Sequence, residues 1–123
     1  MLETGLTHTS SLTVTEVLTA KAMGSGDMPV LATPAMMALM ENAAMLAVAP
    51  ELPEGSTTVG GHIESSHLKP TPLGVEVKAE ATLTKVDGRK LYFTVKAMQG
   101  DAVIGEGTHL RFIVDREKFM SKL

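Results

Sequence analysis

Glu41 is the residue whose position most needs a chemical explanation. It lies in the run PAMMALMENAAMLAVA, from Pro34 to Ala49, in which Glu41 and Asn42 are the only clearly polar residues. Because an unpaired buried carboxylate is costly, a glutamate on a buried helix must be paired, protonated or functional. The alternative is that Glu41 and Asn42 mark a narrow solvent-exposed stripe on the helix.

Thr33 precedes this run and lies eight residues before Glu41. Eight residues are close to two helical turns, so both side chains fall on the same side of a helix. A hydroxyl beside free amides at a helix N-terminus stabilises developing negative charge, such as a thioester oxyanion. The alternative is that Thr33 simply caps the helix, with Pro34 as its first residue.

His67 stands near the end of a predicted strand over 56–69, just before the turn of residues 70–74, PTPLG. Imidazole titrates near neutrality and therefore serves as an acid or a base, whereas a surface histidine is the other interpretation. Gly60 and Gly61 lie within the same strand, where glycine marks either the close approach of a ligand or close packing against the helix.

Other polar clusters carry less weight. His62, Glu64 and His67 have the composition of a metal site, but on a strand the first two share one face while His67 points to the other. With no cysteine ligand either, we predict no metal site. His109 and Arg111 share a face of the last strand and are predicted to be a surface pair.

These residues must be positioned by one helix and several strands. The helix over 34–49 ends at Pro50 and is apolar nearly all round, which predicts a buried helix. Alternating apolar and polar residues, with turn signals at 87–88 and 100–101, predict the strands. Residues 22–27 read as a loop, and 116–122 as a short helix or a frayed end. The predicted strands cover residues 7–18, 56–69, 75–84, 91–97 and 102–114, with Ile104, Leu110, Phe112 and Val114 on one face of the last.

This order predicts a single α+β domain over residues 1–123. A curved antiparallel sheet of about five strands would wrap around one long central helix, as in a hotdog fold. Such an open sheet leaves an unpaired edge and a partly apolar outer face, so we expect a homodimer.

Composition excludes several classes of function. The chain has 123 residues, no cysteine, 3% aromatic residues and a net charge of −3, which argues against nucleic-acid binding. The apolar helical run is too short to span a membrane. The first residues lack the pattern of a signal peptide, so a cytoplasmic location is expected.

The motifs together resemble a known family. Leu31-Ala32-Thr33-Pro34, Met40-Glu41 and Ser66-His67 stand in the order and spacing of the hotdog acyl-CoA thioesterases of the fluoroacetyl-CoA thioesterase type. The similarity continues through residues 86–89, VDGR, and 104–109, IGEGTH. It covers nearly the whole chain from about residue 30 onward.

The resemblance implies a homodimer, or a tetramer, with active sites near the subunit interface that hydrolyse an acyl-CoA thioester. Thr33 would hold and polarise the thioester, Glu41 would be nucleophile or general base, and His67 would be acid or base. Gly60, Gly61 and Arg111 are the predicted substrate-binding residues. No cofactor is expected beyond the coenzyme A of the substrate.

Two alternatives to this function remain at this point. The first is a non-catalytic acyl-CoA or small-ligand binding module on the same fold. The second is a hotdog hydratase, but the Asp-x-x-x-x-His motif of those enzymes is missing. The fluoroacetyl enzyme also has an aromatic lid before the helix, and residues 17–30 contain no aromatic side chain. A different short or medium acyl group is therefore expected.

Overall fold

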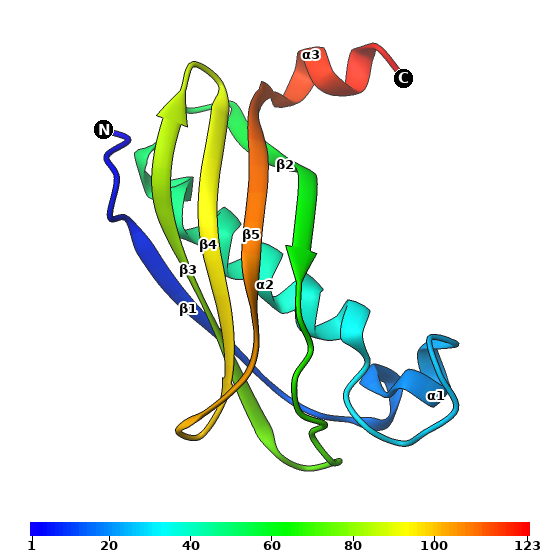
Figure 1. The fold of residues 1–123 in the computed structure, drawn as a ribbon. Coiled ribbons are helices and arrows are strands. Elements are labelled where there is room, and N and C mark those ends of the chain that lie inside the picture. The colour runs from blue at the N-terminus through cyan, green and yellow to red at the C-terminus, as the bar shows by residue number, and fades with distance from the viewer.

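A five-stranded antiparallel sheet curls around one long helix in the computed structural model, which describes residues 1–123 (Figure 1). The strand order is β1-β3-β4-β5-β2, and helix α2 (Thr33–Val48) crosses one face of the sheet. The predicted α+β hotdog architecture is confirmed. The strands are β1 (Thr7–Thr13), β2 (Ser56–Ser65), β3 (Glu76–Asp87), β4 (Lys90–Gln99) and β5 (Ala102–Asp115).

The short elements differ in detail from the predictions. The first strand ends at Thr13, and a 3-10 turn, η1 (Glu16–Leu18), follows it. The first two residues of the predicted loop over 22–27 belong instead to a helical turn, α1 (Ala20–Met23), which the Thr19 hydroxyl caps by accepting a hydrogen bond from the Ala22 amide at 3.2 Å. A second 3-10 turn, η2 (Ala49–Glu51), extends α2, and α3 (Arg116–Ser121) is the predicted C-terminal helix.

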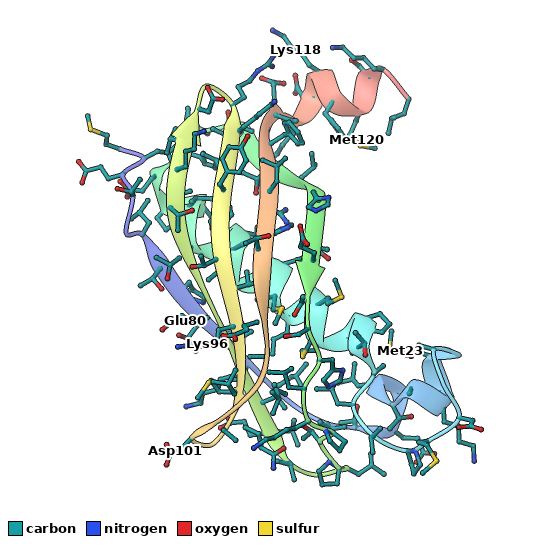
Figure 2. The ribbon with its side chains drawn as sticks, viewed as in Figure 1. Met23, Glu80, Lys96, Asp101, Lys118 and Met120 are labelled. Atoms are coloured by element: carbon teal, nitrogen blue, oxygen red, sulfur yellow. The ribbon has the colours of Figure 1, made fainter.

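The core lies between α2 and the concave face of the sheet. Alternate residues of β3 are buried as predicted, and the opposite face of the sheet is polar: Glu80 and Lys96 are cross-strand neighbours there (Figure 2). Alanines on both surfaces let the helix lie close to the strands. The buried helical residues are Ala35, Met36, Leu39, Met40, Ala43, Ala44, Ala47 and Val48.

The other face of α2 remains uncovered in the single chain. Ala38 and Leu46 are exposed, and Met37 and Met45 are only half-buried. The prediction of a helix buried all round is therefore wrong for one chain, because the sheet covers only one side of it. No helix of the chain is long and apolar enough to cross a bilayer.

A bulge in β5 reverses the predicted orientation of that strand. Val103 pairs with Met98 and Gly105 with Ala97, so Ile104 is an extra residue with no partner on β4. One extra residue moves every following side chain to the other face. Ile104 is buried in the core, but Leu110 and Phe112 do not share its face, and His109 and Arg111 are buried instead.

We predict that Met36→Ala destabilises the fold strongly. Met36 is completely buried between α2 and the sheet, so truncation leaves a cavity and should lower the free energy of unfolding by about 2–5 kcal/mol. The matched control is Met28→Ala, whose side chain is 61% exposed and which should change stability little. Urea unfolding of the two variants measures both, and equal stabilities would contradict the assignment of the core.

Candidate active site

Thr33 and His67 form one half of the candidate site, at the N-terminal end of α2. Thr33 is the first residue of the helix, and the capping position belongs to Ala32, which makes no side-chain cap hydrogen bond. The Thr33 Oγ1 atom instead lies 2.7 Å from Nδ1 of His67. The interpretation of Thr33 as a helix cap is therefore wrong, since its hydroxyl is used to hold the imidazole.

The other ring nitrogen of His67 has no partner. Its Nε2 atom is buried and makes no hydrogen bond within the chain, although buried polar atoms in proteins are nearly always paired. Burial lowers the pKa of the imidazole below its ordinary value of 6.5, and the nearby Lys69 backbone, which raises it, offsets this only in part. The ring is therefore held by Thr33 on one side and leaves a nitrogen free for another molecule on the other.

Thr33 and His67 open onto a pocket of about 300 Å³ beside α1. Aliphatic side chains line much of it, and Lys69 contributes a positive charge. The helix N-terminus adds the partial positive charge of its free amides. The lining residues are Ala20, Ser25, Val30, Leu31, Thr33, His67, Leu68, Lys69 and Pro70.

Glu41 and Arg111 form the second half of the site, farther along α2. The Glu41 Oε2 atom lies 3.9 Å from Nη1 of Arg111, which is an ion pair without a direct hydrogen bond. The Arg111 side chain is 8% exposed and that of Glu41 40%. Glu41 is thus less buried than its position in an apolar helix predicted, because it lies at the border of the uncovered face.

Three hydrogen bonds hold the guanidinium of Arg111. Nε donates to Thr58 Oγ1 at 2.8 Å, Nη2 donates to the Thr58 carbonyl at 2.9 Å, and Nη1 lies 3.2 Å from His109 Nε2. The Nδ1 atom of His109 in turn lies 2.6 Å from the His62 carbonyl oxygen. The prediction of a surface pair at His109 and Arg111 is wrong: the bulge at Ile104 turns both side chains toward the helix.

The two glycines of β2 face different neighbours. A Cβ atom on Gly60 would lie 2.7 Å from Glu41 Oε2, 3.5 Å from the His109 ring and 3.6 Å from Arg111 Nη1. Gly60 thus leaves room where these three side chains converge. A Cβ atom on Gly61 would overlap the ring of Phe112. Gly61 therefore permits packing against Phe112, and its part in substrate binding stays a prediction.

Within one chain Thr33 contacts His67, whereas Glu41 pairs with Arg111 and makes no hydrogen bond to either of the other two. Thr33 and Glu41 are eight residues apart on one helix, which separates their backbones by about 12 Å along its axis. His62 and Glu64, which the sequence analysis considered as metal ligands, lie away from these residues and form an exposed pair at 3.2 Å. Sequence reasoning missed Thr58, because only the paired structure of β2 and β5 places its hydroxyl against Arg111.

We predict that the protein becomes less stable as the pH falls below about 6.5. Burial lowers the pKa values of both His67 and His109, so the unfolded chain takes up protons that the folded chain resists. The free energy of unfolding should therefore stay level above the unfolded pKa and decline below it, toward the folded pKa. Urea unfolding at pH 7.5 and at pH 5.5, at one protein concentration, measures this slope.

The controls separate His109 from the rest of the chain. His109→Gln should reduce the slope, whereas His8→Gln, on the edge strand β1, should leave it unchanged. Equal stability of the unmodified protein at both pH values would contradict the prediction, because it would mean that His67 and His109 are protonated as easily in the folded chain as in the unfolded one.

Comparison with known proteins places this geometry in a family. Residues 14–117 match the family described as fluoroacetyl-CoA-specific thioesterase. The fluoroacetyl-CoA thioesterase of Streptantibioticus cattleyicolor is 42% identical over 94 residues, which cover 76% of this chain and 68% of that protein.

Solved structures agree with the sequence comparison. The fluoroacetyl-CoA thioesterase FlK superposes with a TM-score of 0.91 at 34% identity, covering 99% of this chain and 95% of the other. A thioesterase superfamily member from Thermus thermophilus gives a TM-score of 0.89 at 28% identity, covering 98% of this chain and 89% of the other. The chain therefore belongs to the fluoroacetyl-CoA-specific thioesterase family.

Proposed function

We propose that this protein hydrolyses the thioester of an acyl-CoA to the free acid and coenzyme A. The observation that carries the proposal is the Thr33–His67 pair, whose free Nε2 atom is buried at the N-terminus of α2 with no partner in the chain. Such an atom needs a polar group from a bound molecule. Membership of a thioesterase family supports a thioester as that molecule.

The arrangement supplies the groups that thioester hydrolysis requires. Water adds to the carbonyl carbon, the bond from carbon to sulfur breaks, and the thiolate of coenzyme A takes up a proton. When Nδ1–H of His67 donates to Thr33 Oγ1, the hydroxyl proton of Thr33 stays available, and it and the amides at the start of α2 stabilise the negative charge on the carbonyl oxygen. His67 donates or accepts a proton through Nε2, and Glu41 either attacks the carbonyl or removes a proton from water.

Two copies of the chain are needed to assemble this set of groups. Within one chain the 12 Å rise along α2, by the ~1.5 Å per residue of a helix, keeps Glu41 away from a carbonyl held by Thr33. The uncovered face of α2 carries Ala38 and Leu46, and β2 is an edge strand of the sheet. A homodimer that covers both features would place the Thr33–His67 pair of one copy near Glu41 of the other.

The acyl group is short or of medium length. The segment of residues 17–30 contains no aromatic side chain, and the pocket near Thr33 is lined by Ala20, Val30 and Leu31. Small aliphatic walls favour a small apolar acyl group. Among relatives, variants of FlK have been determined in complex with acetyl-CoA and with fluoroacetate.

We predict that Glu41→Gln lowers kcat by at least about 10²–10⁴-fold for any acyl-CoA that the protein accepts. The amide keeps the shape of the side chain but can neither attack the carbonyl nor remove a proton. The measurement is release of free thiol from a panel of acyl-CoAs, with Glu117→Gln on α3 as the matched control. Unchanged turnover would remove Glu41 from the mechanism, and thiol release by neither protein would favour a binding module.

We predict that two inactive variants restore activity when they are mixed. In a dimer of one His67→Ala chain and one Glu41→Gln chain, one of the two composite sites keeps both side chains. After unfolding and refolding together, about a quarter of all sites should be intact, because half of the dimers are mixed in a symmetric random assembly.

The control for subunit mixing is the double variant that carries both substitutions on one chain. Refolded with the unmodified protein, it also gives mixed dimers, but each of their sites then lacks one of the two groups. Activity in this control should fall below the share of unmodified chains. If the first mixture stays inactive while mixed dimers form, the groups act within one chain.

A further inference from the structure

We propose that His109, neutral and with its proton on Nδ1, is a positioning residue that holds Arg111 against Glu41, and that protonation of its Nε2 atom releases the guanidinium. The role rests on the proposed function and deepens it, because Glu41 is the nucleophile or general base there. At low pH, this release would change the position of Arg111 relative to the Glu41 carboxylate.

The hydrogen bonds of His109 determine its tautomer. Its Nδ1 atom lies 2.6 Å from the His62 carbonyl oxygen, which can only accept, so the proton is on Nδ1. In the neutral ring the Nε2 atom is then a lone-pair acceptor. It lies 3.2 Å from Arg111 Nη1, which can only donate. Both contacts are satisfied only while the imidazole is neutral.

His109 is the sole anchor for the corner of Arg111 that faces Glu41. The Nε and Nη2 atoms are bound by the side chain and the backbone of Thr58. The Nη1 atom lies 3.9 Å from Glu41 Oε2, and its only hydrogen bond within the chain is to His109. A guanidinium is a rigid plane, so loss of this bond frees it to pivot about the Thr58 edge.

Gly60 shows how tightly these groups are arranged. The space that its Cβ would fill is bounded by Glu41 Oε2, the Cε1 atom of His109 and Nη1 of Arg111. Taken as whole residues, His109 is 2% and Arg111 6% exposed, so water cannot readily replace a broken bond between them. A change at His109 is therefore transmitted to the position of the guanidinium, and from there to the carboxylate.

The groups that surround His109 keep it neutral. Burial is the largest influence and lowers its pKa, and the charges of Arg111 on β5 and His62 on β2 act in the same direction. The His62 carbonyl and the Glu41 carboxylate on α2 oppose them and raise the pKa. On the β4 side, the uncharged ring of Phe93 lies 6.1 Å away. A proton added in acid would place a second cation beside Arg111.

The test uses nuclear magnetic resonance of the ligand-free protein, and so does not depend on any activity. Nitrogen-15 spectra of the imidazole report the tautomer of His109, and the Arg111 Nε–H resonance reports how the guanidinium is held. His109→Gln supplies a carbonyl oxygen near the position of Nε2 that accepts a hydrogen bond but does not titrate. His109→Leu removes the acceptor, and His8→Gln is the control.

In the unmodified protein, we expect the Nδ1–H tautomer and an Arg111 resonance that shifts and exchanges faster as His109 becomes protonated. His109→Gln should remove this pH dependence, and His109→Leu should give the fast-exchanging form at every pH. Thiol release should rank in the same order, with His109→Gln retaining more kcat than His109→Leu.

An Arg111 resonance that stays unchanged through the titration of His109 would overturn the proposal, since Thr58 alone would then hold the guanidinium. The same holds if the proton is on Nε2. If His109→Leu does not fold, the titration of the unmodified protein and its comparison with His109→Gln still show whether protonation of His109 releases Arg111. Failure of acyl-CoA hydrolysis with the expected spectra would reject the proposed function and leave the role of His109 in place.

Discussion

The close packing of α2 on the concave face of the sheet is the interaction on which the rest of the structure depends. Alanines make up half of the buried residues of the helix, and Ala79, Ala81 and Ala97 face them from β3 and β4. Small side chains on both surfaces bring the helical backbone near the strands. The same closeness puts Glu41, in the middle of the helix, within reach of a side chain that rises from β5.

The bulge at Ile104 decides which side chains can use that closeness. Without the extra residue, Leu110 and Phe112 would face the helix and Arg111 would lie on the outer surface. With it, a histidine and an arginine enter a mostly apolar interior. Two buried polar side chains require partners, which Thr58 and the backbone of β2 provide. The cluster around Arg111 thus follows from one irregularity in pairing.

The site is divided along the length of α2. One group gathers at the helix N-terminus, where free amides and the Thr33 hydroxyl suit a negatively charged oxygen. The other lies two turns farther on, where Arg111 faces a carboxylate. A helix is rigid, so this separation cannot close within one chain. The uncovered face of α2 and the free edge of β2 are the surfaces that the proposed homodimer would cover.

Local patterns in the sequence were enough to predict the helix and the five strands. They also singled out Thr33, Glu41 and His67 as candidates, whose catalytic roles stay a prediction. Periodicity, turn residues and motif spacing can be read from the sequence without knowledge of the fold.

These local patterns were not enough to predict the orientation of β5, because a bulge leaves no mark in the alternation of apolar residues. Only the pairing of β5 with β4 showed that His109 and Arg111 point inward. In the same way, the contact with His67 and the uncovered side of α2 arise between segments far apart in the chain. Tertiary packing therefore decided that Thr33 is no cap and that Glu41 is half-exposed.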